Sequence, residues 1–178
     1  NSAESVDSDG DGTGNNADSD DDGDGLSDDA ETSAGTNPLL ADTDGDSVND
    51  AADELPLNST ESVDTDKDGT GNNSDIDDDG DGVSDSEDSF PLDSSESIDS
   101  DGDGTGNNAD SDDDNDGVAD SSDSFPLNSA ESVDSDGDGT GNNADTDDDN
   151  DGVLDASDAF PFDASETADS DGDGSGNN

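Results

Sequence analysis

Twelve-residue segments with aspartate at alternate positions recur throughout this chain. In residues 77–88, oxygen-bearing side chains stand at positions 1, 3, 5, 9 and 12, and a glycine stands at position 6. Alternate residues of a short extended segment can converge on one point, and about six to eight oxygen ligands are what a Ca²⁺ ion requires. Glycine at position 6 lets the backbone turn sharply, because it has no Cβ to disfavour a positive φ. The spacing therefore predicts a calcium-binding loop.

The composition excludes a conventional hydrophobic core. Leu, Ile, Val and Phe together number 21 of 178 residues, against 58 acidic residues and a single basic residue, Lys67, which gives a formal net charge of -57. A chain this poor in apolar residues is disordered unless something other than a core orders it. Its charge repels nucleic acid and anionic membranes, and no apolar run reaches transmembrane length. We therefore predict no nucleic-acid partner and no membrane span.

Catalysis is not expected from these residue types. The chain has no His, Cys or Tyr, and its one lysine lies inside a loop. Paired carboxylates do acid–base work in a dry cleft, but here every pair lies in a solvated ligand loop. The sequence accordingly predicts that the protein is not an enzyme, and the lack of cysteine excludes disulfides and thiolate metal sites.

The segments are organised as tandem repeats with a period of 35 residues, which is the spacing between Asp64, Asp99, Asp134 and Asp169. Both ends of the sequence fall inside the repeat pattern, so we expect these residues to be a segment of a longer array of repeats. The predicted parts are a partial spacer at 1–6, repeat 1 at 7–63 with an insertion at about 31–52, repeat 2 at 64–98, repeat 3 at 99–133, repeat 4 at 134–168 and a partial repeat at 169–178.

Each repeat holds two loops followed by a spacer. We call them loop A, which reads Asp-x-Asp-x-Asp-Gly-Thr-Gly-Asn-Asn-x-Asp, and loop B, which begins two residues after loop A ends. The insertion adds one loop at 42–53, in which Ser47 replaces the position 6 glycine, so we expect that site to be weaker. One residue separates loops A and B, so two ions should lie close together and be coupled. The aspartate at position 2 of loop B is a spare carboxylate that could bridge the two ions. In the four repeats this residue is Asp21, Asp78, Asp113 and Asp148.

The predicted ligands are the side-chain oxygens at positions 1, 3, 5, 9 and 12 and the backbone carbonyl at position 7. In the loops A they are Asp7, Asp9, Asp11, Thr13, Asn15, Asp18, Asp64, Asp66, Asp68, Thr70, Asn72, Asp75, Asp99, Asp101, Asp103, Thr105, Asn107, Asp110, Asp134, Asp136, Asp138, Thr140, Asn142 and Asp145. In the loops B they are Asp20, Asp22, Asp24, Leu26, Asp28, Glu31, Asp77, Asp79, Asp81, Val83, Asp85, Asp88, Asp112, Asp114, Asp116, Val118, Asp120, Asp123, Asp147, Asp149, Asp151, Val153, Asp155 and Asp158. In the insertion loop and the partial repeat they are Asp42, Asp44, Asp46, Val48, Asp50, Asp53, Asp169, Asp171, Asp173, Ser175 and Asn177.

These ligand sets favour calcium, with about two ions or more per 35-residue repeat. All the ligands are hard oxygens, which disfavours zinc, copper and iron, and flexible cages of up to about seven oxygens suit calcium better than magnesium. The neutral asparagine at position 9 should make loop A weaker than loop B. Glu31, with its longer side chain, suits bidentate closure of the first loop B.

We expect a calcium-ordered repeat array that is mostly irregular coil and loops, elongated, fibre-like and without a conventional core. The loops are too rich in Gly, Asp and Asn for helix or strand interiors. Short helical turns are expected after position 9, for example at 28–33 and 49–54. Phe90, Leu92 and Ile98 are expected to make a small contact between spacer and loop, the alternative being a solvent-exposed linker.

The pattern over residues 64–91 resembles the thrombospondin type 3 repeat, and residues 31–46 are similar to the bacterial version of that repeat. The resemblance covers nearly the whole chain. It implies calcium ions wrapped by a long chain with little regular structure, in secreted or surface proteins. The eukaryotic repeats carry disulfides, whereas this sequence has Phe or Leu before Pro where they have Cys.

The predicted function is an extracellular calcium-binding structural array: a fibre, stalk or adhesin segment of a microbial cell surface. Its expected partners are calcium ions, other copies of the array and cell-surface glycans. The alternative is a disordered acidic linker for halophilic solubility or mineral binding, in which the acids need no phasing. A calcium sensor would need an apolar groove that this composition does not supply. Glycosylation stays open for two Asn-x-Ser/Thr sites (Asn58 and Asn72) and the position 2 hydroxyls of loop A, which are otherwise simply small polar loop residues.

Overall fold

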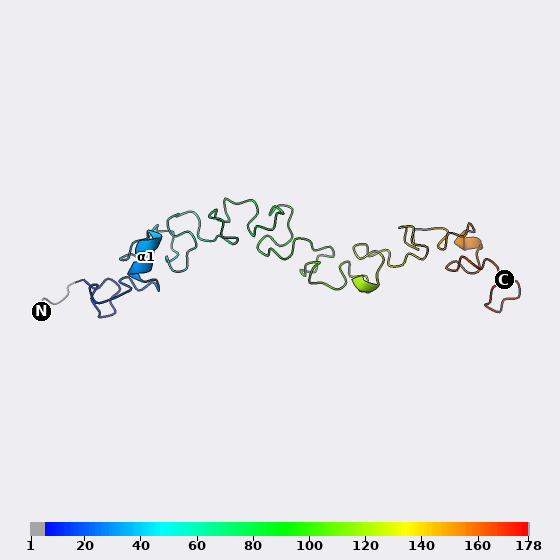
Figure 1. The fold of residues 1–178 in the computed structure, drawn as a ribbon, viewed down its shortest axis with the longest axis horizontal. Helices are drawn as coiled ribbons and strands as arrows, with labels where there is room; N and C mark the ends of the chain where they lie inside the picture. Colours follow the sequence, from blue (N-terminus) through cyan, green and yellow to red (C-terminus); the bar gives the residue numbers. More distant parts are fainter. Residues whose placement is uncertain (1–5, 178) are drawn as a thin grey trace. The chain divides into compact units, whose positions relative to one another are not determined.

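Loops and turns make up nearly all of the computed structural model of the chain, which describes residues 6–177. The helix α1 spans Asp28–Ala34, and two single 3₁₀ turns follow, η1 at Asp120–Ser122 and η2 at Asp155–Ser157 (Figure 1). No strand occurs within the described residues. The expectation of irregular loops with short helical turns is confirmed.

Local capping accounts for α1. Ser27 precedes it in an extended conformation, and its side chain accepts a hydrogen bond from the Ala30 amide. Acidic residues fill the first turn, where they oppose the positive end of the helix dipole. Gly35 ends the helix with φ of 92° and donates its N–H to the Glu31 carbonyl. The turn expected at 49–54 is shorter: the Asp53 amide donates to the carbonyl of Asn49 without forming a helix.

The interior of the chain is polar. Among the described residues no apolar side chain is buried, and the expectation of no conventional core is confirmed. Phe90 is half-buried, but Leu92 and Ile98 are 61% and 57% exposed, so the spacer forms no apolar cluster of its own. The buried polar and charged side chains are Glu31, Thr36, Asp50, Asp53, Glu61, Asp64, Asp79, Glu96, Glu131 and Asp148.

Backbone hydrogen bonds close each loop and the spacers that begin at Glu54, Ser124 and Ala159. In every loop, including the partial one, the amide at position 9 donates to the carbonyl of the residue before position 1, over 2.9 to 3.1 Å. In the spacer, a turn runs from the Phe125 carbonyl to the Asn128 amide, and the Ser124 amide donates to Ser132. The segment between two loops therefore doubles back on itself and delivers the chain to the next loop A.

The chain divides into two units, Asn1–Ser94 and Ser95–Asn178. The first holds α1, the insertion loop and the loops up to residue 88, and the second holds η1, η2 and the later loops. The division falls within the spacer at 89–98. No helix within residues 6–177 has the length and apolarity needed to cross a membrane.

Candidate metal centres

The carboxylates at positions 1, 3 and 5 converge. Ten groups of at least three acidic residues within the described chain place one carboxylate oxygen per residue within 4.8 Å of the others. Examples are Asp77, Asp79 and Asp81 of the second loop B. Close like charges repel each other, so the convergence must be enforced by other interactions.

Backbone amides enforce it. Asp77 accepts hydrogen bonds from the amides of Gly80 and Gly82, at 3.1 Å each, one to each carboxylate oxygen. Asp79 accepts from the position 5 amide, and Asp81 accepts from the position 7 amide of Val83 at 2.6 Å. In every loop, the partial one included, the position 6 amide donates to the position 1 carboxylate. The position 4 amide does so where that residue is glycine. Each side chain is thus oriented by a neighbouring N–H group rather than by another side chain.

Position 4 of every loop has a positive φ, a constraint that the sequence analysis did not identify. Seven of the ten residues at this position are glycine, and the other three, Lys67, Asn115 and Asn150, adopt φ of 66°, 56° and 58°. Asparagine tolerates this left-handed conformation better than most residues. Lys67 is held there with an ion pair to Glu54 at 3.2 Å. Ser47 at position 6 has φ of 87°, so it keeps the glycine geometry at a backbone cost.

Eight of the ten loops also contain carboxylate oxygens that are buried and have no hydrogen-bond partner. Burying such an oxygen unpaired is costly, and a bound cation removes that cost. At position 3 these oxygens are Oδ2 of Asp22, Asp44, Asp79, Asp101, Asp114, Asp136 and Asp149. At position 12 they are Oδ2 of Asp53, Asp88, Asp123 and Asp158. The donor set is therefore one that Ca²⁺ fits.

The pKa values of these groups show the same cost. Burial raises the pKa of Asp79, with further contributions from the charges of Asp81 and Asp88. Burial likewise raises the pKa of Asp149 and Asp53. A raised carboxyl pKa means that the metal-free loop disfavours its own charges.

Glu31 is the most deeply buried ligand candidate. Its side chain is 0% exposed, and neither carboxylate oxygen has a hydrogen-bond partner. Burial, followed by the charges of Asp22, Asp24 and Asp50, raises its pKa to about 7. The helix α1 places Glu31 over the first loop B, and the Ala51 amide of the insertion loop donates to Asp24 at 3.0 Å. The insertion loop and the first loop B are therefore in direct contact.

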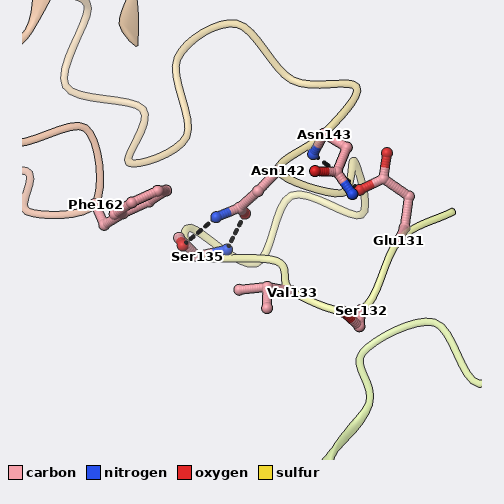
Figure 2. A pocket seen from close by; sticks show the side chains of 7 residues that line it. All are labelled: Glu131, Ser132, Val133, Ser135, Asn142, Asn143 and Phe162. Carbon is pink, nitrogen blue, oxygen red and sulfur yellow. Dashed lines mark hydrogen bonds between the residues drawn. The ribbon is translucent and has the colours of Figure 1, made fainter. Parts of the chain in front are cut away.

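Position 9 of loop A is engaged with position 2. The Asn142 side chain accepts from the Ser135 amide at 3.0 Å and donates to the Ser135 hydroxyl at 2.8 Å (Figure 2). The other loops A repeat this pair, with Thr65 and Asn72 in the second. Both polar atoms of each predicted asparagine ligand thus already have partners in position 2.

A spacer glutamate anchors the second, third and fourth loops A, and the sequence analysis missed it. Glu131 is 7% exposed and accepts from the Asn143 amide at 2.9 Å, while the Asn143 side chain donates to the Ala130 carbonyl (Figure 2). Glu61 and Glu96 make the equivalent contacts. The available signal was the recurrence of this glutamate, and of glycine and asparagine at positions 8 and 10 of loop A, with the period of the repeat.

Glycine at position 8 is required by this contact. A Cβ on Gly71 would lie 2.6 Å from Glu61 Oε2, and the glutamates approach Gly106 and Gly141 more closely still. The pocket of about 370 Å³ drawn in Figure 2 lies beside the Glu131 contact, and Glu131 is the single acidic residue in its lining. The pocket is therefore separate from the sites where ligand oxygens converge.

Comparison with known families agrees with this geometry. The thrombospondin type 3 repeat model matches residues 98–132 and 133–168, and the bacterial TSP3 repeat model matches residues 20–41. Together these matches cover just over half of the chain, and they confirm the resemblance drawn from the sequence. No curated protein matches the chain at a significant level. Thrombospondin type 3 repeats bind calcium, and this chain belongs to that family as a cysteine-free array of such repeats.

Proposed function

We propose that the chain is an extracellular structural array, a fibre, stalk or adhesin segment of a microbial cell surface, whose loops wrap several Ca²⁺ ions and are stiffened by them. The observation that carries the proposal is what the loops bury. Their interiors contain unpaired carboxylate oxygens, and no apolar side chain is buried within residues 6–177. Calcium therefore takes the place of a hydrophobic core.

The use of calcium in place of a hydrophobic core determines how the loops are stabilised. Without metal, converging carboxylates repel each other and the loops open. Since the metal binds the folded loop, its binding energy becomes folding energy. Each occupied site adds about 2.7 kcal/mol when calcium exceeds Kd a hundredfold. Extracellular calcium modules have Kd values of about 10⁻⁴–10⁻³ M, which suits the weaker loops of such an array.

The proposal includes neither catalysis nor sensing. Most of the acidic residues stand at ligand positions of the loops, and a sensor needs an apolar groove that opens on binding. Bacterial-type sequence at residues 20–41 supports a microbial source. Other copies of the array and surface glycans are the proposed partners.

Small-angle X-ray scattering of the whole chain tests the proposal. In chelator the expected profile is that of a swollen coil, with a radius of gyration of about 45 Å or more for this length. Millimolar calcium should convert it reversibly to a narrow, stiff particle, and magnesium at the same concentration should do so less completely. If the coil persists at millimolar calcium, the acidic segment is disordered and the structural role is wrong.

A further inference from the structure

The aspartates at position 2 of the second, third and fourth loops B are Asp78, Asp113 and Asp148, and each has a side-chain oxygen that no hydrogen bond within its own loop satisfies. Asp148 is 6% exposed, and its Oδ1 is buried without a hydrogen-bond partner. Oδ1 of Asp78 and of Asp113 is buried in the same way. Position 2 is not a ligand position of a twelve-residue calcium loop. These oxygens therefore need another explanation.

Elsewhere, position 2 pairs with position 9 of the same loop. Ser135 pairs with Asn142 in loop A, and the Thr43 hydroxyl donates to Asp50 at 2.6 Å in the insertion loop. In loop B both positions are aspartate. The Asp148 amide still donates to Asp155, at 2.9 Å, but two carboxylates cannot pair. The Asp148 side chain must therefore find a partner outside its loop.

The preceding loop A is the nearest such neighbour. After burial and Asp155, the charge with the largest effect on the pKa of Asp148 is that of Asp145, and Asp136 also contributes. These are positions 12 and 3 of loop A. Asp113 faces the equivalent pair in the third repeat. Oδ2 of Asp136 is itself buried and unpaired, so each of the two loops contributes one unsatisfied carboxylate oxygen.

Loop A also has fewer oxygens of its own to offer. The polar atoms of Asn142 are bonded to Ser135, and Oδ1 of Asp145 accepts the amides of Thr146 and Asp147. In the second repeat the two loops touch, because a Cβ on Gly80 would lie 2.8 Å from Asp66 Oδ2. An oxygen from loop B can therefore reach the loop A site.

We propose that the position 2 aspartate of the second, third and fourth loops B completes the metal shell of the preceding loop A, so that the loop A ion is held by both loops. This rests on the proposed calcium binding. It makes loop A dependent on a folded loop B, whereas loop B contains its own full set of ligands. The two sites of a repeat are then coupled through one side chain.

Replacing Asp78 by alanine in the full chain tests this, with Glu87→Ala as the matched control. Both residues lie in the same loop B outside its ligand positions, and both changes remove one charge, but Glu87 is exposed. The Gly69 amide donates to Asp64 of loop A, and the Gly82 amide donates to Asp77 of loop B. In a calcium titration followed by NMR, the two amide resonances therefore report the two sites separately.

The quantity compared is the calcium concentration at which half of an amide's chemical-shift change has occurred. In Asp78→Ala this midpoint should rise about tenfold or more at Gly69 and less than threefold at Gly82. Glu87→Ala should leave both within twofold, and Asp78→Asn, which keeps an oxygen, should fall in between at Gly69. An unchanged Gly69 midpoint, or a larger shift at Gly82 than at Gly69, would overturn the shared shell. If neither amide responds to calcium in the unmodified chain, the proposed function fails instead.

Discussion

Replacing Glu131 by alanine removes the anchor between a spacer and its loop A. The Glu131 carboxylate accepts the Asn143 amide at 2.9 Å from a position that is 7% exposed. Hydrogen bonds to charged groups contribute about 1.5–3 kcal/mol. Because Asn143 is itself exposed, we take the lower end, about 1.5 kcal/mol. A difference of that size makes local opening roughly tenfold more frequent.

Amide hydrogen exchange of the calcium-loaded chain measures this opening, and the chain supplies its own reference. Asn108 is held by Glu96 in the same way, and both amides lie in the sequence Gly-Asn-Asn-Ala, so their intrinsic exchange rates match. In Glu131→Ala, exchange at Asn143 should rise about tenfold while Asn108 is unchanged. A change of less than threefold at Asn143, or an equal rise at both amides, would refute the reasoning. Glu87→Ala, which removes an exposed acid, should affect neither.

Three further outcomes follow from the same geometry. Gly141→Ala should accelerate Asn143 exchange about as much as Glu131→Ala, but add less than about threefold in a Glu131→Ala background, because the clashing side chain is then gone. Ser47→Gly should tighten calcium binding by the insertion loop about fivefold in a calcium titration, since it relieves about 1 kcal/mol of backbone strain at φ of 87°. The pKa of Glu31, raised from 4.5 to about 7 in the folded metal-free loop, means that this loop loses stability as pH rises through that range, which favours the open chain at neutral pH. Hydrogen exchange in chelator, corrected for intrinsic rates, should therefore show the Gly35 amide at the end of α1 more protected at pH 5 than at pH 8, and this difference should be smaller in Glu31→Gln. An equal pH dependence in both chains would contradict the assignment.

The loop chemistry could be predicted from the sequence because it is local. Positions 1, 3 and 5 lie within five consecutive residues, so alternation alone brings Asp77, Asp79 and Asp81 together. The same holds for α1, whose cap Ser27 and terminating Gly35 are adjacent to the residues they act on. No long-range information is needed for either feature.

The contacts between loops and spacers could not be predicted in this way. Glu131 and Asn143 are twelve residues apart, and one carboxylate among 58 acids carries no mark of its role. The left-handed conformation at position 4 could not be predicted, because glycine, asparagine and lysine (Lys67) all occupy that position. In the third and fourth loops B, where asparagine takes that position, the position 1 carboxylate keeps an unpaired buried Oδ1. The period of the repeat marks the glutamate as recurrent, but only the geometry shows what it contacts.

These contacts move the boundaries of the folding unit. By sequence, a repeat begins at the first aspartate of loop A, such as Asp99. By contact, loop A depends on the glutamate three residues earlier, and the division between the two units of the chain falls just before that residue, between Ser94 and Ser95. Loop A in turn lies against loop B. The smallest segment that contains all of these contacts therefore runs from the spacer glutamate through the end of loop B, and the rest of the spacer, with Leu92 exposed, connects one such segment to the next.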